Sequence, residues 1–285
     1  MLRECTKNEF EQNIEFAYGL AMDRTRSGYP AYYDGIKTKE MFIRRALKAF
    51  DRDAEQMLVF ERDDSVQGLI HFYWIPEDRY LQTIGFNIAA GTEQALSEFI
   101  AYIGHRFREY DAHFGFPAEN REAVGFLARQ GFACIENDYN NTAFLDRCGE
   151  MPEKDGLIRI GRENYDVFRA IHSRMDGGMY WNSDRMLDAL EEWAIFVSEK
   201  DGEPRGAVYY RQCGEGWYEI YGIDIDQEKH DPELFRELLN AALRDAKRRD
   251  GRAMTFFCEE EYEKAALECG FECVGNYLCY KTHLE

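Results

Sequence analysis

Residues 127–135 read LARQGFACI and residues 266–274 read ALECGFECV, so one Gly-Phe motif occurs twice in this chain. Gly131 and Gly270 stand 139 positions apart (270 − 131 = 139). This distance is far longer than the period of a solenoid repeat, and it indicates two domain-sized copies. The motif therefore predicts a tandem duplication.

Two further pairs of segments recur at nearly the same distance. LVFERDDSVQGLIHF (58–72) matches FVSEKDGEPRGAVYY (196–210) in its apolar and charged positions, at an offset of 196 − 58 = 138. YLQTIGFNI (80–88) matches WYEIYGIDI (217–225) at an offset of 217 − 80 = 137. Three matches in one order are hard to obtain by chance, so the duplication spans the chain.

The segment between the two copies has the composition of a linker. Residues 148–155, CGEMPEKD, combine Gly149 and Pro152 with charges of both signs. Such a stretch between apolar segments is typical of a domain boundary. We therefore predict domains at 1–147 and 156–285.

Composition limits the class of protein. A chain of 285 residues with 45% hydrophobic residues can bury two cores. It has no run of 18 apolar residues, and its first residues, MLRECTKNEF, lack the apolar core of a signal peptide, so we expect a cytoplasmic protein without a membrane partner. The net charge of −19 would repel nucleic acid, although it could steer a cationic amine towards the protein.

The eight cysteines do not form a metal-binding pattern. Cys258, Cys269, Cys273 and Cys279 cluster near the end of the sequence, but no tight C-x2-C pair occurs among them. Free cysteine behaves as a small buried hydrophobe. We therefore expect reduced thiols and no metal.

Hydrophobic periodicity predicts the same order of elements in both copies. In the first copy it predicts helices at 8–22, 38–50, 93–110 and 120–130. It predicts strands at 57–62, 66–75, 80–88, 111–116, 132–136 and 140–145. The second copy repeats the pattern from residue 157, with helices near 163–173, 183–192, 232–249 and 259–269.

This order of elements, together with one local motif, resembles the GNAT acyltransferases, which use acetyl-CoA to acylate amines. NREAVGFLARQGF (120–132) is similar to the family's N-x-x-A-x-x-x-Y-x-x-x-G-F segment, with Asn120, Ala123, Gly131 and Phe132 in register. The resemblance covers the whole chain, once per half. It implies an α/β (α+β) fold of two tandem GNAT-like domains, each a mixed, mostly antiparallel sheet flanked by helices.

The resemblance implies that acetyl-CoA is held by a loop after the third strand, where backbone N–H groups at a helix start bind the pyrophosphate. The first copy's loop is about two residues shorter than the family's, but its residues are small. The implied cofactor-binding residues are Ile88, Ala89, Ala90, Gly91, Thr92 and Asn120. These residues could equally form a turn and cap two helices, so both interpretations stay open.

The corresponding loop of the second copy is acidic. DQEKHDPELFRELL (226–239) has no glycine, and Asp231, Pro232 and Glu233 make a good helix start by themselves. Their carboxylates would repel a pyrophosphate. We therefore expect the first copy to bind CoA and the second to support or shape the acceptor site.

Amine acylation needs a base for the amine proton and an acid for the leaving thiolate. The tyrosine that commonly supplies the acid in the family is replaced by Leu127 in one copy and Ala266 in the other. The third strand, where the family often places a glutamate base, carries Glu219 in the second copy and Gln82 in the first. The candidate catalytic residues are Glu219, Tyr139, Tyr277 and His71. Each could instead be an ordinary packed strand residue.

The loop after the first helix is aromatic in both copies. In GNAT folds this region closes over the acceptor, so the implied acceptor-binding residues are Tyr29, Tyr32, Tyr33, Tyr180 and Trp181. Aromatic faces suit a cationic or ring-bearing ligand, and they suit the covering of a core equally well.

The sequence thus predicts an acetyl-CoA-dependent N-acyltransferase acting on an unidentified, small amine. The alternative is a catalytically inactive GNAT-like protein that binds a ligand or oligomerises without using acetyl-CoA. An aminoacyl-tRNA donor is disfavoured by the negative charge. A homodimer stays open, because the last strand of a GNAT-like unit can pair outside its own domain.

Overall fold

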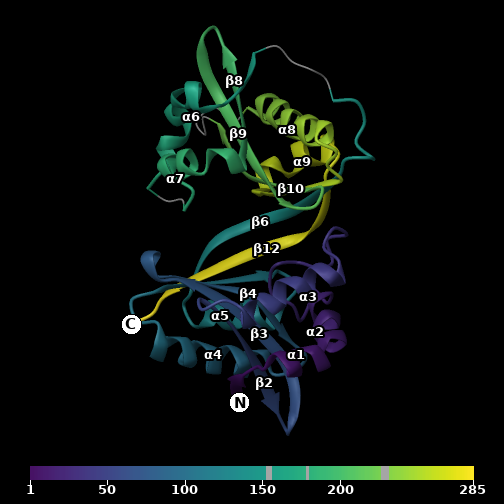
Figure 1. Cartoon of the computed structure of the whole chain (residues 1–285), viewed down its shortest axis with the longest axis vertical. Coiled ribbons are helices and arrows are strands. Elements are labelled where there is room, and N and C mark those ends of the chain that lie inside the picture. The colour runs from purple at the N-terminus through teal and green to yellow at the C-terminus, as the bar shows by residue number, and fades with distance from the viewer. Residues whose placement is uncertain (152–155, 178–179, 226–230) are drawn as a thin grey trace. The chain divides into compact units, whose positions relative to one another are not determined.

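The computed structural model describes residues 1–151, 156–177, 180–225 and 231–285. Contacts within it divide the chain into two compact units. Unit 1 comprises Met1–Asp138 and Gly275–Glu285, and unit 2 comprises Tyr139–Val274. Each unit combines a sheet with helices (Figure 1).

The sheet of unit 1 has the strand order β1-β2-β3-β4-β5-β12. Its strands are β1 (Leu2–Glu4), β2 (Glu55–Arg62), β3 (Ser65–Ile75), β4 (Tyr80–Ile88), β5 (Asp111–Pro117) and β12 (Glu272–His283). Its α-helices are α1 (Lys7–Gln12), α2 (Ile14–Ala21), α3 (Lys39–Leu47), α4 (Thr92–Arg106) and α5 (Arg121–Arg129). Neighbouring strands are antiparallel, except that β4 and β5 are parallel.

Unit 2 repeats this plan with the strand order β6-β11-β10-β9-β8-β7. Its strands are β6 (Ala133–Phe144), β7 (Leu157–Arg159), β8 (Trp193–Lys200), β9 (Glu203–Gly214), β10 (Trp217–Ile225) and β11 (Ala253–Cys258). Its α-helices are α6 (Tyr165–His172), α7 (Ser183–Asp188), α8 (Pro232–Arg248) and α9 (Glu260–Glu268). Here β10 and β11 form the parallel pair. The predicted fold, a mostly antiparallel sheet flanked by helices in each half, is confirmed.

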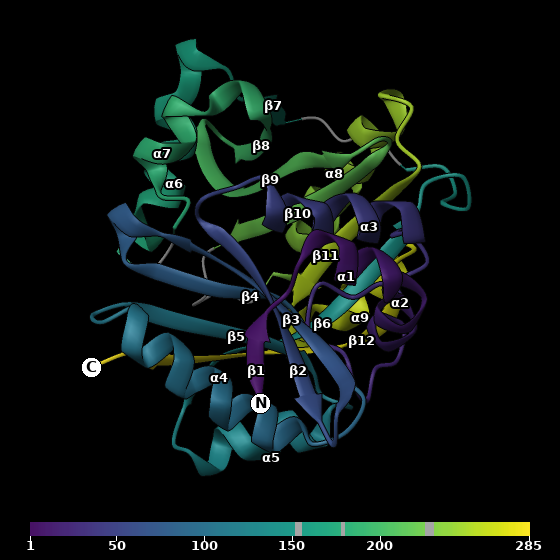
Figure 2. The ribbon, with the colours of Figure 1, turned by 60° about the horizontal axis from the view of Figure 1, so that its bottom comes forward.

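Each sheet buries apolar side chains on both faces. In unit 1, α4 and α5 pack on one face, where Phe72, Phe99 and Phe114 are fully buried. The other face is covered by α1, α2 and α3 around Phe10 and Val59. Figure 2 shows these two groups of helices on opposite sides of the unit 1 strands. Burying one such phenylalanine contributes about 1.5–3 kcal/mol, so these layers account for much of the unit's stability.

The last strand of each copy contributes to both units. Residues 139–144 of β6 pair with β11 in unit 2, and residues 277–283 of β12 pair with β5 in unit 1. The predicted pair of short strands at 132–136 and 140–145 is wrong: the structure has one continuous strand, because its second half finds a partner in the other unit. Figure 1 shows both long strands, and each has 12 residues.

Unit 1 therefore combines two separate stretches of chain, whereas unit 2 is one consecutive stretch. Relative to the domains expected at 1–147 and 156–285, the ends of β6 and β12 are exchanged. Part of the expected linker, residues 152–155, lies outside the described residues. The duplication itself extends to the end of the chain, since β6 and β12 begin 139 positions apart (272 − 133 = 139).

Two predicted helices are divided in the structure, and the one near 183–192 forms α7 and a separate 3-10 turn at Leu190–Glu192. The stretch 8–22 forms α1 and α2, separated by Asn13, whose Nδ2 donates to the Glu9 carbonyl at 2.8 Å. An asparagine that binds the backbone in this way competes with helical hydrogen bonding. Among the described residues, no helix has the length and apolarity that a membrane crossing requires.

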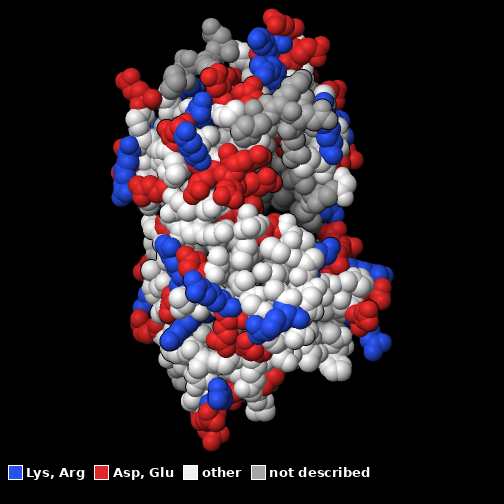
Figure 3. All heavy atoms as spheres, turned by 180° about the vertical axis from the view of Figure 1, so that it is seen from behind, with Lys and Arg blue, Asp and Glu red and all other residues white. Residues whose placement is uncertain are grey.

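The charged side chains are unevenly distributed over the surface. On the face drawn in Figure 3, most lysines and arginines lie beside acidic residues, and one contiguous cluster is acidic. The net charge of −19 is therefore not a uniform field, and local charge has to be considered site by site.

Candidate functional site

The parallel strands of each unit pair over a short stretch and then separate. In unit 1 the pairing runs from Tyr80↔Asp111 to Gln82↔His113. In unit 2 it runs from Trp217↔Ala253 to Ile220↔Phe256. Beyond these pairs, the facing main-chain N–H and C=O groups need other partners. The separated strands leave a gap between them, and whatever lies in this gap determines what each unit can bind.

In unit 1 the gap holds a segment of the chain itself. The Ile88 N–H of β4 donates to the Arg26 carbonyl, and the Tyr29 N–H donates to the Gly115 carbonyl of β5, both at 3.0 Å. Residues 26–29 thus bridge the two strands after their own pairing has ended. The edge of β4 at Ile88 is no longer available to a ligand's amide groups.

The inserted segment is closely packed. The Gly28 N–H donates to Asn87 Oδ1 at 3.2 Å, and Asn120 Nδ2 donates to the Ser27 carbonyl at 3.0 Å. Ser27 and Asn120 are both 0% exposed. A Cβ on Gly28 would meet the Phe86 main-chain N at 2.8 Å, so a side chain there requires a shift. Asn120 Oδ1 also accepts a hydrogen bond from the Ala123 N–H and so caps α5. Both the oxygen and the nitrogen of this side-chain amide are therefore used within the fold.

The start of α4 is occupied by carboxylates of the protein. Gly91 precedes the helix with φ +77°, a conformation that favours glycine. Glu122 Oε1 accepts a hydrogen bond from the Glu93 N–H in the first turn at 3.3 Å. Glu93 also pairs with Arg129. A pyrophosphate at this helix start would have to displace Glu122 and its charge.

The gap of unit 2 is different. Within the described residues, no main-chain hydrogen bond joins residues 221–225 to a segment other than β9. The Asp224 side chain is held by His172 Nδ1 at 2.7 Å and by the Tyr209 hydroxyl at 3.3 Å. Burial alone would lower the pKa of His172, but its hydrogen bond to Asp224 raises that pKa overall.

The helix after this strand is also capped by the protein. Asp231 accepts a hydrogen bond from the Leu234 N–H at 3.0 Å and pairs with Arg205 at 2.7 Å. The N-cap predicted at Asp231, with Pro232 opening the helix, is therefore confirmed. The preceding loop residues 226–230 lie outside the described residues.

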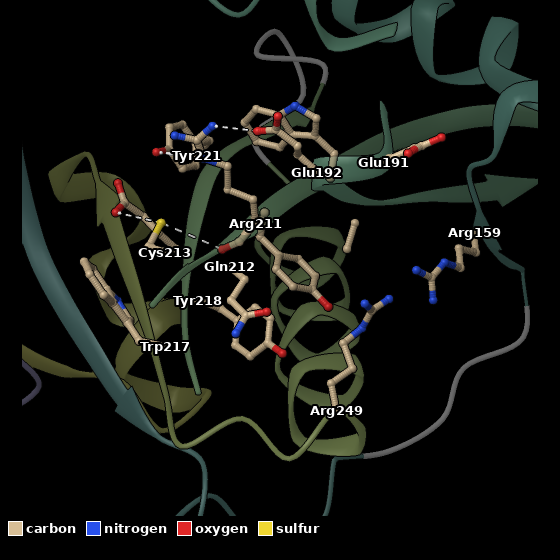
Figure 4. A pocket seen from close by; sticks show the side chains of 14 residues that line it. Arg159, Glu191, Glu192, Arg211, Gln212, Cys213, Trp217, Tyr218, Tyr221 and Arg249 are labelled. Carbon is tan, nitrogen blue, oxygen red and sulfur yellow. Dashed lines mark hydrogen bonds and ion pairs between the residues drawn. The ribbon is translucent and has the colours of Figure 1, made fainter. Parts of the chain in front are cut away.

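Unit 2 contains a cavity of about 690 Å³ beside the start of β10, shown in Figure 4. Its walls come from β7, β8, β9, β10, the turn before β8 and the residue after α8. It is lined by Arg159, Glu191, Glu192, Trp193, Ala194, Tyr210, Arg211, Gln212, Cys213, Trp217, Tyr218, Glu219, Tyr221 and Arg249. A volume of this size is typical of a small-molecule site.

Glu219 brings a carboxylate into this cavity. It is half-buried on β10, and Cys213 Sγ lies 3.7 Å from its Oε2. Burial, with the nearby Glu219 charge, raises the pKa of the Cys213 thiol to about 12, so the thiol is protonated at neutral pH. Cys213 is therefore a weak hydrogen-bond donor to the carboxylate rather than a nucleophile.

Arg211 is held in place by aromatic rings. Its guanidinium carbon lies 5.2, 5.4 and 4.8 Å from the ring centroids of Trp181, Trp193 and Tyr221. Its Nε donates to the Tyr221 hydroxyl at 3.1 Å. Such contacts fix a cation and its orientation. Trp181, one of the two aromatic residues predicted for the acceptor site of the second copy, thus contacts the cavity-lining Arg211. The other, Tyr180, is 45% exposed.

The strand exchange redistributes the two candidate tyrosines. Tyr139 of the first copy pairs with Cys258 in unit 2. Tyr277 of the second copy pairs with Pro117 in unit 1, where its ring meets that of Tyr29 edge-on at 4.5 Å. Neither lines the unit 2 cavity.

His71 lies in the interior of unit 1. Its Nε2 is 2.6 Å from Glu55 Oε1, and Glu55 also pairs with Arg45. Burial lowers the pKa of His71, so the ring is neutral at pH 7. The adjoining cavity, lined by Tyr32 among others, has only about 20 Å³, room for roughly one water. Tyr32 packs in this core, whereas Tyr33 is half-buried with the Arg24 guanidinium carbon 4.7 Å from its ring centroid.

Sequence reasoning missed most of the cavity. Of the predicted residues only Glu219 lines it, while Arg211 and Tyr221 stand on the aligned strands without a recognisable motif. Arg159 and Arg249 come from distant segments, so no local spacing could have joined them. Within the described residues, no group of three or more His, Cys, Asp or Glu side chains is arranged to hold a metal ion.

No protein-family model and no curated protein sequence matches the chain. Solved structures do match it. A GCN5-related N-acetyltransferase from Sphaerobacter thermophilus superposes with TM-score 0.67 at 12% identity, covering 100% of this chain and 96% of that one. A tandem GNAT protein from the clavulanic acid biosynthesis pathway has TM-score 0.54 at 13% identity, covering 100% and 98%.

A third match is to part of a larger protein. The glucosamine N-acetyltransferase region of a fungal multi-domain GH3 β-N-acetylglucosaminidase has TM-score 0.62 at 11% identity, covering 99% of this chain and 38% of that one. At these identities the likeness concerns the fold. The chain has the tandem GNAT fold, as expected from the order of its elements and its segment 120–132.

Proposed function

We propose that the protein is an acyl-CoA-dependent N-acyltransferase that uses acetyl-CoA and acylates a small amine in the cavity of unit 2. The observation that carries this proposal is Glu219, a carboxylate on the parallel strand pair that lines a cavity of about 690 Å³. The matching residue of unit 1, Gln82, has no basic group, and its Oε1 accepts hydrogen bonds from Tyr73 and Tyr80 at 2.8 and 2.7 Å.

The contrast between the two gaps favours unit 2 as the donor half, the half that binds the acyl donor acetyl-CoA. In unit 1, residues 26–29 and Glu122 stand where a pantetheine arm and a phosphate would have to lie. In unit 2, the edge of β10 at residues 221–225 can offer main-chain groups to an extended amide-bearing arm. The sequence favoured the first copy for this task, and the filled gap of unit 1 moves the proposal to unit 2.

Acetyl-CoA would supply the acyl group as a thioester, and the residues of unit 2 would handle the protons. The Glu219 carboxylate accepts the proton of the attacking amine, directly or through one water. Tyr221 is the candidate acid for the leaving sulfur. Burial raises the pKa of its hydroxyl, so it retains its proton at neutral pH. Arg211 holds that hydroxyl by donating to its oxygen.

Calorimetric titration of the full-length protein with acetyl-CoA, followed by mass spectrometry of amine mixtures incubated with it, tests this proposal. About one site per chain with micromolar affinity, roughly −8 kcal/mol, and an acetylated product are the expected results. Absence of product from every amine tested, despite donor binding, would contradict the acyltransferase assignment.

A second candidate is a GNAT-like protein that binds a ligand without using acetyl-CoA. The observation favouring it is that both relevant helix starts carry protein carboxylates, Glu122 at α4 and Asp231 at α8. It predicts no heat and no thermal stabilisation with acetyl-CoA at millimolar concentration. Retained binding of a small amine under those conditions would support it.

A further inference from the structure

A histidine in the interior of unit 2 joins two segments that border the proposed site. His172 ends α6 and is 0% exposed, with its ring stacked on that of Phe168 at 4.8 Å between centroids. Its Nδ1 lies 2.7 Å from Asp224 Oδ2, and its Nε2 lies 2.8 Å from the Trp181 carbonyl oxygen. Both ring nitrogens are therefore within hydrogen-bond distance of an oxygen.

These two oxygens determine how many protons the ring carries. A carbonyl oxygen and a carboxylate oxygen only accept hydrogen bonds, so both ring nitrogens have to donate, and only the imidazolium form can do so. Burial lowers the pKa of His172, but the hydrogen bond to Asp224 raises that pKa overall. The geometry and the electrostatics thus agree that the fold favours the charged ring.

Other titratable groups near the ring favour the same form. Asp176, in the turn after α6, adds a second negative charge that raises the pKa of His172 further. The Tyr209 hydroxyl of β9 donates to Asp224 Oδ1 at 3.3 Å. The α7 helix contributes Asp184, which pairs with Arg169 of α6 at 2.8 Å. The groups named here therefore balance a buried cation at His172.

The segments that His172 joins belong to the donor side and the acceptor side of the proposed site. Asp224 lies on β10 beyond its pairing with β11, where the acyl donor is proposed to bind. Trp181 precedes α7, and its ring centroid lies 5.2 Å from the Arg211 guanidinium carbon. Arg211 donates to the hydroxyl of Tyr221, the candidate acid, and lies beside its ring in Figure 4. A continuous set of contacts therefore connects His172 to Tyr221.

We propose that His172 is a positioning residue for acyl transfer, which as an imidazolium holds the Trp181 segment and thereby fixes Arg211 and Tyr221. This proposal rests on the proposed function, because Tyr221 is the candidate acid of that reaction. His172 is fully buried and does not line the cavity, so it acts through Trp181 rather than on a ligand.

Loss of one proton breaks one of the two hydrogen bonds. The remaining proton stays on Nδ1, because the Asp224 carboxylate is a stronger acceptor than a carbonyl. Nε2 then presents a lone pair to the Trp181 carbonyl, and two facing acceptors repel each other. The segment stays attached through Ser183, whose N–H and hydroxyl donate to Asp176 Oδ1 at 2.7 and 2.8 Å. The expected result is a displaced Trp181 ring in a folded protein.

The first measurement needs no catalysis. Tryptophan fluorescence of the full-length protein is recorded from about pH 5 to about pH 9, and the spectrum of Trp181→Phe is subtracted to give the Trp181 signal. This signal should show one transition, above about pH 6.5, that is absent from His172→Gln. Nitrogen NMR of the histidine rings, assigned with the same variant, should show both nitrogens of His172 protonated below the transition.

The second measurement is the pH dependence of kcat and KM for acetyl transfer. Wild-type kcat should fall as the pH rises through the same transition. Tyr221 does not cause this fall, because burial raises the pKa of its hydroxyl, and deprotonation of the acceptor amine acts in the opposite direction. His172→Gln should lower kcat roughly tenfold or more below the transition and remove the fall, with KM for acetyl-CoA within about threefold.

Two further variants keep the test specific. Asp224→Asn removes the anion that raises the pKa of His172, so the fluorescence transition and the fall in kcat should both move to lower pH. This variant carries the test if thermal unfolding shows that His172→Gln does not fold. The control is His283→Gln, an exposed histidine of unit 1 whose Nδ1 lies 3.0 Å from Asp111 Oδ1. It should change neither the transition nor kcat.

Each contrary result has a different meaning. A His172 ring that is neutral throughout the range, or a Trp181 transition that persists in His172→Gln, overturns the proposal. Equal kcat and equal pH profiles for wild type and His172→Gln overturn the positioning role and leave the acyltransferase proposal standing. A transition that depends on His172, without acetyl transfer to any amine, overturns the acyltransferase proposal and supports His172 as the residue that holds the Trp181 segment.

Discussion

The two units open the same pair of parallel strands, yet among the described residues only unit 1 fills the opening with its own chain. There, residues 26–29 bridge β4 and β5, and Asn120 anchors them. In unit 2, the described residues leave β10 beyond Ile220 paired with β9 alone. A duplicated fold therefore does not duplicate a binding site, because the site depends on what enters the gap. This contrast underlies the proposal that unit 1 serves stability and unit 2 carries the chemistry.

The largest expected effect tests the chemical side of this contrast. Glu219→Gln should lower kcat for acetyl transfer by about 10²–10⁴-fold, because the amide cannot take the amine proton. Gln82→Ala, the matched change in unit 1, should leave kcat within roughly twofold, since nothing there acts as a base. Steady-state assays on both variants measure the ratio. Equal losses would remove the distinction between the units.

Asn120 tests the structural side. Asn120→Ala removes the cap of α5 and leaves the buried Ser27 carbonyl without its donor, so the free energy of unfolding should fall by about 2–4 kcal/mol. Glu259 precedes α9 in unit 2 without a capping side-chain hydrogen bond. Glu259→Ala should therefore change stability by less than about 0.5 kcal/mol. Denaturant titrations compare the two, and similar values would contradict the anchoring role.

Gly28 tests the close fit of the inserted segment. Gly28→Ala places a Cβ 2.8 Å from the Phe86 main-chain N, and it should cost about 1–3 kcal/mol of unfolding free energy. At Gly104, within α4, a Cβ would meet no atom within 4 Å, so Gly104→Ala should be neutral or stabilising by up to about 1 kcal/mol. Thermal or denaturant unfolding measures both, and a neutral Gly28→Ala would show that the gap is loosely filled.

The smallest effect concerns pH. Asp224 raises the pKa of His172 in unit 2, so this pair stabilises the fold fully below pH 6.5 and less as pH rises through the raised value. Burial lowers the pKa of His71 in unit 1, so the unfolded chain takes the proton first and stability falls as pH drops below 6.5. His172→Gln should thus be costlier at pH 5 than at pH 8, and His71→Gln the reverse. Unfolding at both pH values shows whether the two histidines differ in sign.

Much of the fold could be predicted from local sequence patterns. Gly131 and Gly270 mark matching helix ends, and the strands around Gly85 and Gly222 aligned because apolar spacing is a local property. The continuous strands β6 and β12 were not foreseen, since their pattern does not reveal that the end of β6 pairs in unit 2 and the end of β12 pairs in unit 1. Pairing partners are non-local, and a strand's own residues specify them weakly.

Of the residues that line the cavity, only Glu219 was among the candidates from the sequence. The segment RTRSGYP (24–30) contains turn residues, and nothing in it indicates insertion between two strands more than 50 positions away. The cavity gathers Arg159, Arg211 and Arg249 from three distant elements, so its charge pattern exists only in the folded chain. Expectations for the small residues at 88–92 rested on composition, whereas the contact between Glu93 and Glu122 is tertiary.

Hydrogen–deuterium exchange of the full-length protein, with and without saturating acetyl-CoA, tests the central claim most directly. If unit 2 is the donor half, peptides covering β10 (Trp217–Ile225) gain protection, and peptides covering residues 80–92 of unit 1 exchange as before. Protection confined to residues 80–92 would contradict the account, because it would mean that acetyl-CoA displaces residues 26–29 from the unit 1 gap.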